Sequence, residues 1–68
     1  MSITLETEIL AALKSGGMLT ISTIALNVKV TEWQVRRAAI KLQRKDFAFK
    51  NRHDEWQITP AGRTAATR

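Results

Sequence analysis

The sequence contains no cysteine, a single histidine and no long apolar run. Without cysteine, neither a disulfide framework nor a thiolate zinc site can form, and one histidine cannot build a histidine metal cluster. We therefore expect no metal and no other cofactor. No apolar run reaches the roughly 18 residues of a membrane span, and residues 1–6 lack the positive start and apolar stretch of a signal peptide. These absences predict one domain over residues 1–68 of a soluble cytoplasmic protein without a membrane partner.

The sequence also lacks a catalytic constellation. It has no glycine-rich phosphate loop, because the pair Gly16-Gly17 alone is the signal of a helix end. Glu6 and Glu8 lie two residues apart on an expected helix, so their side chains point in different directions and do not form a carboxylate pair. We therefore expect a protein that is not an enzyme.

What the sequence does contain is a concentrated patch of positive charge. Eight of its 11 lysines and arginines lie within residues 29–52, together with only Glu32 and Asp46, so this window has a formal charge of 8 − 2 = +6. The whole chain carries +5, so the remaining residues sum to −1. A basic helix followed by a basic hairpin is suited to a polyanion, and duplex DNA is the commonest one.

Two amphipathic helices are predicted in the first half of the chain. The first, at about 5–14, begins after Thr4, which is a good cap, and ends before the two glycines. The second is predicted at about 21–28, after a short extended segment at 18–20. The expected inward stripes are Leu5, Ile9, Ala12 and Leu13 on the first helix, and Ile21, Ile24, Ala25 and Val28 on the second.

The clearest helix signal lies at about 32–45. Thr31 is followed three residues later by Gln34, which is the capping-box pattern of a helix start. Asp46 stands near the helix end, where a glycine is common. The side expected to face the core holds Val35, Ala38, Ala39 and Leu42, and the exposed side holds Trp33, Arg37, Ile40 and Arg44.

A hairpin is predicted at about 47–58. Two alternating segments flank the turn formers at 51–54, which indicates two strands joined by a tight turn. Thr59-Pro60 is a good cap and first position for a short last helix, although Gly62 is expected to weaken this tail, 59–68. The residues expected to face the core are Phe47, Phe49, Trp56 and Ile58.

This order of elements resembles the winged helix-turn-helix fold, a mainly α fold with a small antiparallel hairpin in the order α-β-α-α-β-β and a C-terminal helix. Residues 21–31 look like its second helix and turn, with small Ala25 and the Thr31 cap. Residues 56–63 resemble bacterial regulators of the MarR type, and 30–36 are similar to small regulators of fimbrial operons. Lys29 replaces the usual turn glycine, and the long dimerisation helices of the MarR type are absent.

The resemblance implies sequence-specific binding of double-stranded DNA by a small transcriptional regulator or accessory factor, of bacterial or mobile-element type and nucleoid-associated when bound. Its third helix would enter the major groove, with Gln34 reading adenine and Arg36 or Arg37 reading guanine, and the hairpin would meet phosphates or the minor groove. The expected DNA-binding residues are Thr31, Trp33, Gln34, Arg36, Arg37, Lys41, Arg44, Lys50, Asn51, Arg52 and His53. Each of them is also compatible with an ordinary solvated surface.

An alternative hypothesis is a winged-helix module that binds a protein. Leu26, Trp33 and Ile40 are apolar at positions where helical periodicity predicts exposure, and together they are candidates for gripping a larger DNA-binding protein. A weak homodimer is also compatible with so small a domain. Some winged helices that bind left-handed duplexes use a wing tryptophan, which Trp56 could match, alongside an Asn and a Tyr on helix three. Arg36 and Ile40 occupy the matching positions, which argues against that use.

Overall fold

The computed structural model describes residues 4–66, which form four helices and three short strands. In chain order the elements are α1 (Leu5–Gly16), β1 (Leu19–Thr20), α2 (Ile21–Val28), α3 (Glu32–Arg44), β2 (Ala48–Lys50), β3 (Glu55–Ile58) and α4 (Pro60–Ala66). This is the winged helix-turn-helix order that the sequence predicted. Within residues 4–66, no helix is long and apolar enough to cross a membrane.

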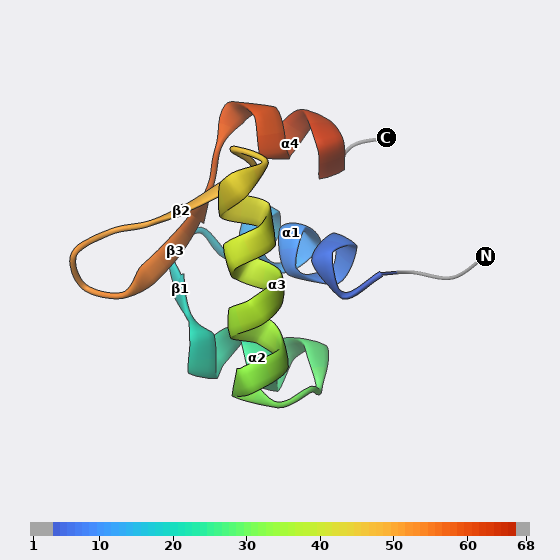
Figure 1. The fold of residues 1–68 in the computed structure, drawn as a ribbon, viewed down its shortest axis with the longest axis vertical. Coiled ribbons are helices and arrows are strands. Elements are labelled where there is room, and N and C mark those ends of the chain that lie inside the picture. Colours follow the sequence, from blue (N-terminus) through green and yellow to red (C-terminus); the bar gives the residue numbers. More distant parts are fainter. Residues whose placement is uncertain (1–3, 67–68) are drawn as a thin grey trace.

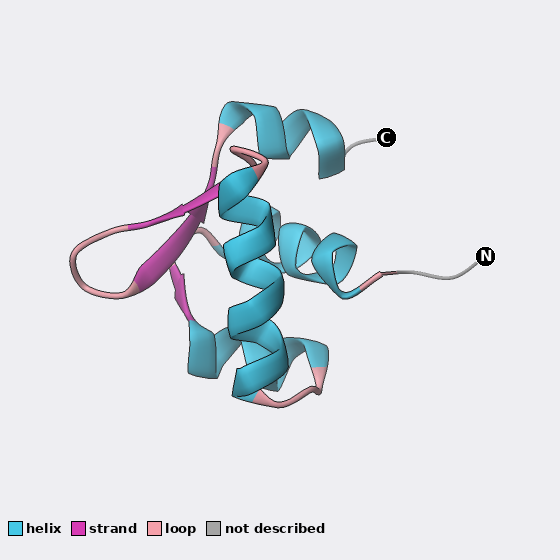
Figure 2. Ribbon diagram, in the orientation of Figure 1, coloured by secondary structure: helices cyan, strands magenta, loops and turns pink. Residues whose placement is uncertain are grey.

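The helices pack together on one side of a small antiparallel sheet. α3 crosses in front of α1, with α2 below it and α4 above (Figure 1). The strands run in the order β1-β3-β2, so the segment before α2 joins the hairpin as a third strand. The loop between β2 and β3 extends away from the helices as a wing (Figure 2). The wing therefore lies to the side of α3.

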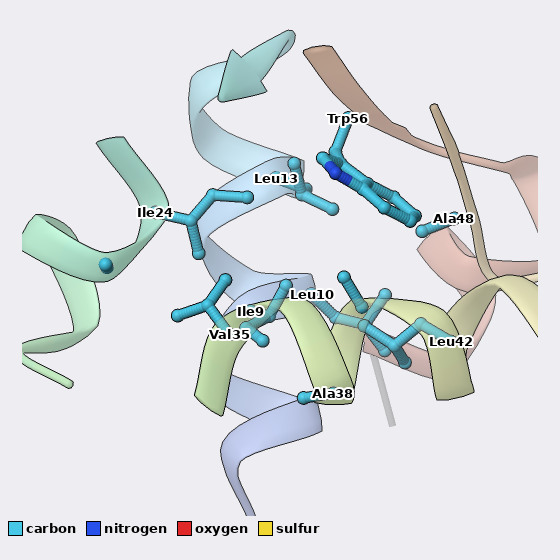
Figure 3. Packing of buried hydrophobic residues seen from close by; sticks show 11 residues of the cluster. Ile9, Leu10, Leu13, Ile24, Val35, Ala38, Leu42, Ala48 and Trp56 are labelled. Atoms are coloured by element: carbon cyan, nitrogen blue, oxygen red, sulfur yellow. The ribbon is translucent and has the colours of Figure 1, made fainter. Parts of the chain in front are cut away.

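The core lies between α1, α2, α3 and the sheet (Figure 3). All four residues of the inward stripe predicted on α3 are buried, and so are Ile24 and Ala25 of α2. On α1 the predicted stripe is only partly right, because Leu10 is buried and Ala12 is not. Leu10 faces inward because α4 as well as α3 packs on α1, which widens the buried face of that helix.

The predicted phase of the first hairpin strand is wrong. Ala48 is buried, whereas Phe49 is 42% exposed. The register explains this, because Ala48 pairs with Ile58 and Phe49 pairs with Gln57, and directly paired residues share one face of a sheet. Trp56 fills the core side of β3, and the small side chain of Ala48 on β2 lies beside it (Figure 3).

Two turns hold residues with left-handed backbone geometry that the sequence places where glycine is usual. Lys29 caps the end of α2 with φ 59 and ψ 44, and Asp46 follows α3 with φ 63. The carbonyl of Asp46 accepts a hydrogen bond from the hydroxyl of Thr59, which also caps α4 through the amide of Gly62. The end of α3 and the start of α4 are thereby tied together.

Gly62 has a role opposite to the one expected. It is buried in α4, and a Cβ atom built there would lie 2.0 Å from the carbonyl oxygen of Phe47. Only glycine allows α4 to approach the chain this closely. The residue therefore seats the last helix instead of weakening it.

Candidate nucleic-acid interface

The outward face of α3 is basic and aromatic. The buried stripe forms the inner side of α3, and the outer side faces solvent. On that outer side Trp33 is 62% and Ile40 is 40% exposed. The capping box predicted at the start of α3 is present. The exposed basic side chains of the helix are Arg36, Arg37, Lys41 and Arg44.

A large hollow separates α3 from the wing. It measures about 690 Å³ and is bounded by the first turn of α2, one flank of α3, and both strands of the wing. Arg36 and Lys50 bring positive charge to it, and Glu32 and Asp54 bring negative charge. Its lining residues are Thr20, Ile21, Ser22, Glu32, Arg36, Ile40, Gln43, Lys50, Asp54 and Trp56.

A smaller hollow of about 230 Å³ lies on the opposite flank of α3, against the start of α1. Trp33, Arg37 and Lys41 line it together with Leu5 and Glu6. The basic residues of α3 are thus divided between two flanks. Arg36 borders the wing, whereas Arg37 and Lys41 border α1.

Gln34 is engaged in the capping box. Its backbone N–H donates to the Thr31 hydroxyl oxygen at 3.2 Å, and its Oε1 accepts from the Thr31 backbone N–H at 3.3 Å and from the Thr31 hydroxyl at 3.2 Å. Two-point recognition of adenine needs both the carbonyl and the amino group of a glutamine side chain. With the capping box intact, only Nε2 of Gln34 is available to a ligand.

The guanidinium of Arg37 lies over the ring of Trp33. The guanidinium carbon of Arg37 lies 5.1 Å from the centroid of the Trp33 ring, which is the geometry of a cation–π pair. They are four residues apart on the same face of α3, so the helix itself brings them together. This is the only cation–π pair in the described part of the chain, and both of its members are predicted site residues.

Two polar residues of the wing, Lys50 and Asn51, interact with other residues of the wing. Nζ of Lys50 lies 3.4 Å from the carboxylate of Asp54. Oδ1 of Asn51 accepts from the backbone N–H groups of His53 and Glu55, at 2.8 and 3.0 Å, and its Nδ2 donates to the Glu55 carboxylate at 3.1 Å. Asn51 therefore shapes the turn. Arg52 and His53 lie exposed in that turn.

The sequence interpretation omitted Thr20, Ser22, Gln43 and Asp54, all of which line the larger hollow. The hollow exists because β1 pairs with β3 and so brings the start of α2 beside the wing. A two-residue strand has no periodicity to detect. The one available signal was Thr20, which caps α2 by accepting from the N–H of Thr23 at 3.3 Å.

The three apolar residues proposed for a protein partner are exposed, as expected, but border three different hollows. Leu26, 79% exposed, lies beside Val30 and Thr31, whereas Trp33 lies beside α1 and Ile40 beside the wing. They therefore line no common hollow. Among residues 4–66, no group of His, Cys, Asp and Glu side chains is arranged to hold a metal ion.

Solved structures similar to this chain are winged-helix proteins. The MarR-family protein Rv2887 of Mycobacterium tuberculosis superposes with a TM-score of 0.89 at 21% identity, over 98% of this chain and 50% of that one. The YusO protein of Bacillus subtilis gives 0.85 at 26% identity, over 93% and 49%. The fold is that of the winged helix-turn-helix proteins.

The Zalpha domain of Cyprinid herpesvirus 3 ORF112, solved for its binding to Z-DNA, superposes with a TM-score of 0.78 at 20% identity, over 85% of this chain and all of that one. In contrast, the chain spans about half the length of the MarR-family structures that it matches. No protein-family model and no curated protein matches the sequence.

Proposed function

We propose that this winged helix binds double-stranded DNA sequence-specifically, as a small transcriptional regulator or accessory factor. The observation that carries the proposal is the exposed surface of α3, where Arg37 and Arg44 lie opposite the buried stripe and Arg36 and Lys41 lie at the two flanks. A helix with such a face fits the major groove, and its N-terminal half meets the base edges. Neutralised phosphates would supply most of the affinity.

The residues divide by their place in the fold. Arg36 and Arg37, in the first half of α3, are assigned to base edges, and Lys41 and Arg44 further along are assigned to phosphates. In the wing, Lys50, Arg52 and His53 are assigned to phosphates or the minor groove. Thr31 and Asn51 contribute through the structures they stabilise, the start of α3 and the wing turn.

The similar proteins support this proposal to different degrees. One similar structure, from Silicibacter pomeroyi, is a MarR-family transcriptional regulator, and the Zalpha domain binds Z-DNA. We assign this chain to right-handed duplexes, because Arg36 and Ile40 occupy the two helix-three positions at which winged helices that bind left-handed duplexes carry an Asn and a Tyr. A right-handed major groove also admits the exposed basic face of α3 directly.

A titration monitored by NMR tests the proposal, with a mixed-sequence duplex added at low and then physiological salt. We expect the Trp33 indole resonance, the amides of 34–41 and those of 50–53 to shift together and to return when salt is raised, because phosphate contacts release counterions. The amides of α4 serve as an internal control, since they lie outside the proposed surface.

A titration in which nothing shifts even at low salt would overturn DNA binding. The second candidate function, protein recognition, would then lead, because Leu26 is 79% exposed in a hollow that contains no basic side chain. A larger DNA-binding protein or a second copy of the chain is the partner to test at that hollow.

A further inference from the structure

The cation–π pair of Trp33 and Arg37 has a direction along α3. Side chains on a helix lean toward its N-terminus, so Arg37 lies back over Trp33, at the end of α3 that a recognition helix presents to bases. Trp33 is 62% exposed and therefore contributes little to the core. Within residues 4–66 its ring forms one cation–π pair, the one with Arg37.

Stacking leaves the hydrogen-bonding edge of a guanidinium free. The group is planar, with its N–H donors in the plane, so a ring that covers one face immobilises the fork without using a donor. An arginine held in this way loses less rotamer freedom when it binds than a free arginine does. The fork of Arg37 is thereby prepared for a planar acceptor pair.

Other candidates for base recognition on α3 are less available. Gln34 has its carbonyl oxygen committed to Thr31. Arg36 borders a hollow that also contains the carboxylates of Glu32 and Asp54, so the positive charge around it is partly offset. In the major groove, the acceptor pair that matches an arginine fork is O6 and N7 of guanine.

We propose that Trp33 and Arg37 form one guanine-reading unit, in which Arg37 contacts O6 and N7 and Trp33 is the positioning residue that holds its guanidinium. This inference rests on the proposed DNA binding. If the inference is correct, Trp33 and Arg37 both control the preference for the same base pair. Contacts with phosphates alone would give neither residue such a preference.

The test is selection from a random-sequence duplex pool by the parent protein, Trp33→Ala, Trp33→Phe, Arg37→Ala and Arg44→Ala. We expect Arg37→Ala to erase a guanine preference of about 5- to 150-fold at one position. Trp33→Ala should weaken the preference at that same position about 2- to 5-fold. Trp33→Phe should retain most of it, and Arg44→Ala should lower affinity for all sequences alike.

Two further measurements separate positioning from general weakening. In the best selected duplex, 7-deazaguanine at the sensitive position removes N7 and should cost the parent protein affinity but leave Arg37→Ala unaffected. In the Arg37→Ala background, adding Trp33→Ala should cause no further loss of discrimination. In the free protein, Trp33→Ala should abolish the ring-current shift of the Arg37 side-chain resonances.

The outcomes distinguish the two levels of the proposal. Selection by the parent protein with guanine preference unchanged in both variants would overturn the guanine-reading unit and leave DNA binding standing. Loss of preference in Arg37→Ala but not in Trp33→Ala would overturn the positioning role of the tryptophan. A parent protein that binds no duplex in the pool would overturn both the unit and the proposed function.

Discussion

Gly62 shows how a single residue can hold an element in place. Its missing side chain lets α4 lie against the Phe47 carbonyl, and an added Cβ would be 2.0 Å from that oxygen. We predict that Gly62→Ala lowers the free energy of unfolding by about 1–3 kcal/mol, because the overlap is with backbone that must move. A domain of this size has about 3–10 kcal/mol in total. Urea denaturation measures the change.

Gly16→Ala is the matched control for this substitution. There the added Cβ would meet the Leu19 side chain at 3.0 Å, and that side chain can move aside. Alanine is also favoured over glycine in a helix, so we expect little loss or a small gain in stability. Equal destabilisation by both substitutions would contradict the close-approach explanation. A glycine required by sterics and one that ends a helix look the same in a sequence, which is why the function of Gly62 was missed.

At the scale of elements, the start of α3 is decisive, because it holds the first half of the helix, which is the part proposed to meet the bases. The Thr31 hydroxyl accepts from the Gln34 N–H at 3.2 Å and so satisfies one of the free donors of that turn. Thr31→Ala should cost about 0.5–2 kcal/mol of stability and raise the hydrogen-exchange rate of the Gln34 amide. Thr31→Ser keeps the hydroxyl and should retain both. An unchanged exchange rate in Thr31→Ala would show that the cap does not hold this turn.

Features with a strong local signal were predictable from the sequence, and the pairings between distant segments were not. The Thr31 and Gln34 pattern and the 3.6-residue periodicity located α3 and its buried stripe, because both are properties of a few neighbouring residues. β1 was expected as a short extended segment at 18–20, but its pairing with β3 is a contact between distant residues that no local pattern encodes. The exposure of Phe49 likewise depends on the register with β3, which a three-residue strand does not encode alone.

The candidate site was predictable as a set of charges but not as an arrangement. Composition and periodicity placed the basic residues on the outer side of α3 and in the wing, where the structure has them exposed. The interactions of these residues were not predicted. Asn51 forms hydrogen bonds within the turn, and Lys50 lies near Asp54. The contact of Trp33 with Arg37 follows from a spacing of four residues, a signal that was present in the sequence.

For the molecule as a whole, the question is whether DNA responds to total charge or to the basic surface. The domain measures 28 × 27 × 21 Å, several times the Debye length of about 8 Å at physiological ionic strength. Charges outside the interface should therefore be largely screened from bound DNA. Arg44→Gln and Lys14→Gln each remove one exposed positive charge, the first on α3 within the basic window and the second on α1 outside it.

We predict that these two variants, although equal in net charge, bind DNA differently. Fluorescence anisotropy across a salt series should give the parent protein a log–log slope of roughly −4 to −5, for about four to six neutralised phosphates. Arg44→Gln should reduce this slope by about 1 and weaken binding to all sequences, because one phosphate contact is lost. Lys14→Gln should leave the slope nearly unchanged. If the two variants instead changed the slope equally, attraction would come from the net charge, and α3 would have no privileged contact with the phosphates.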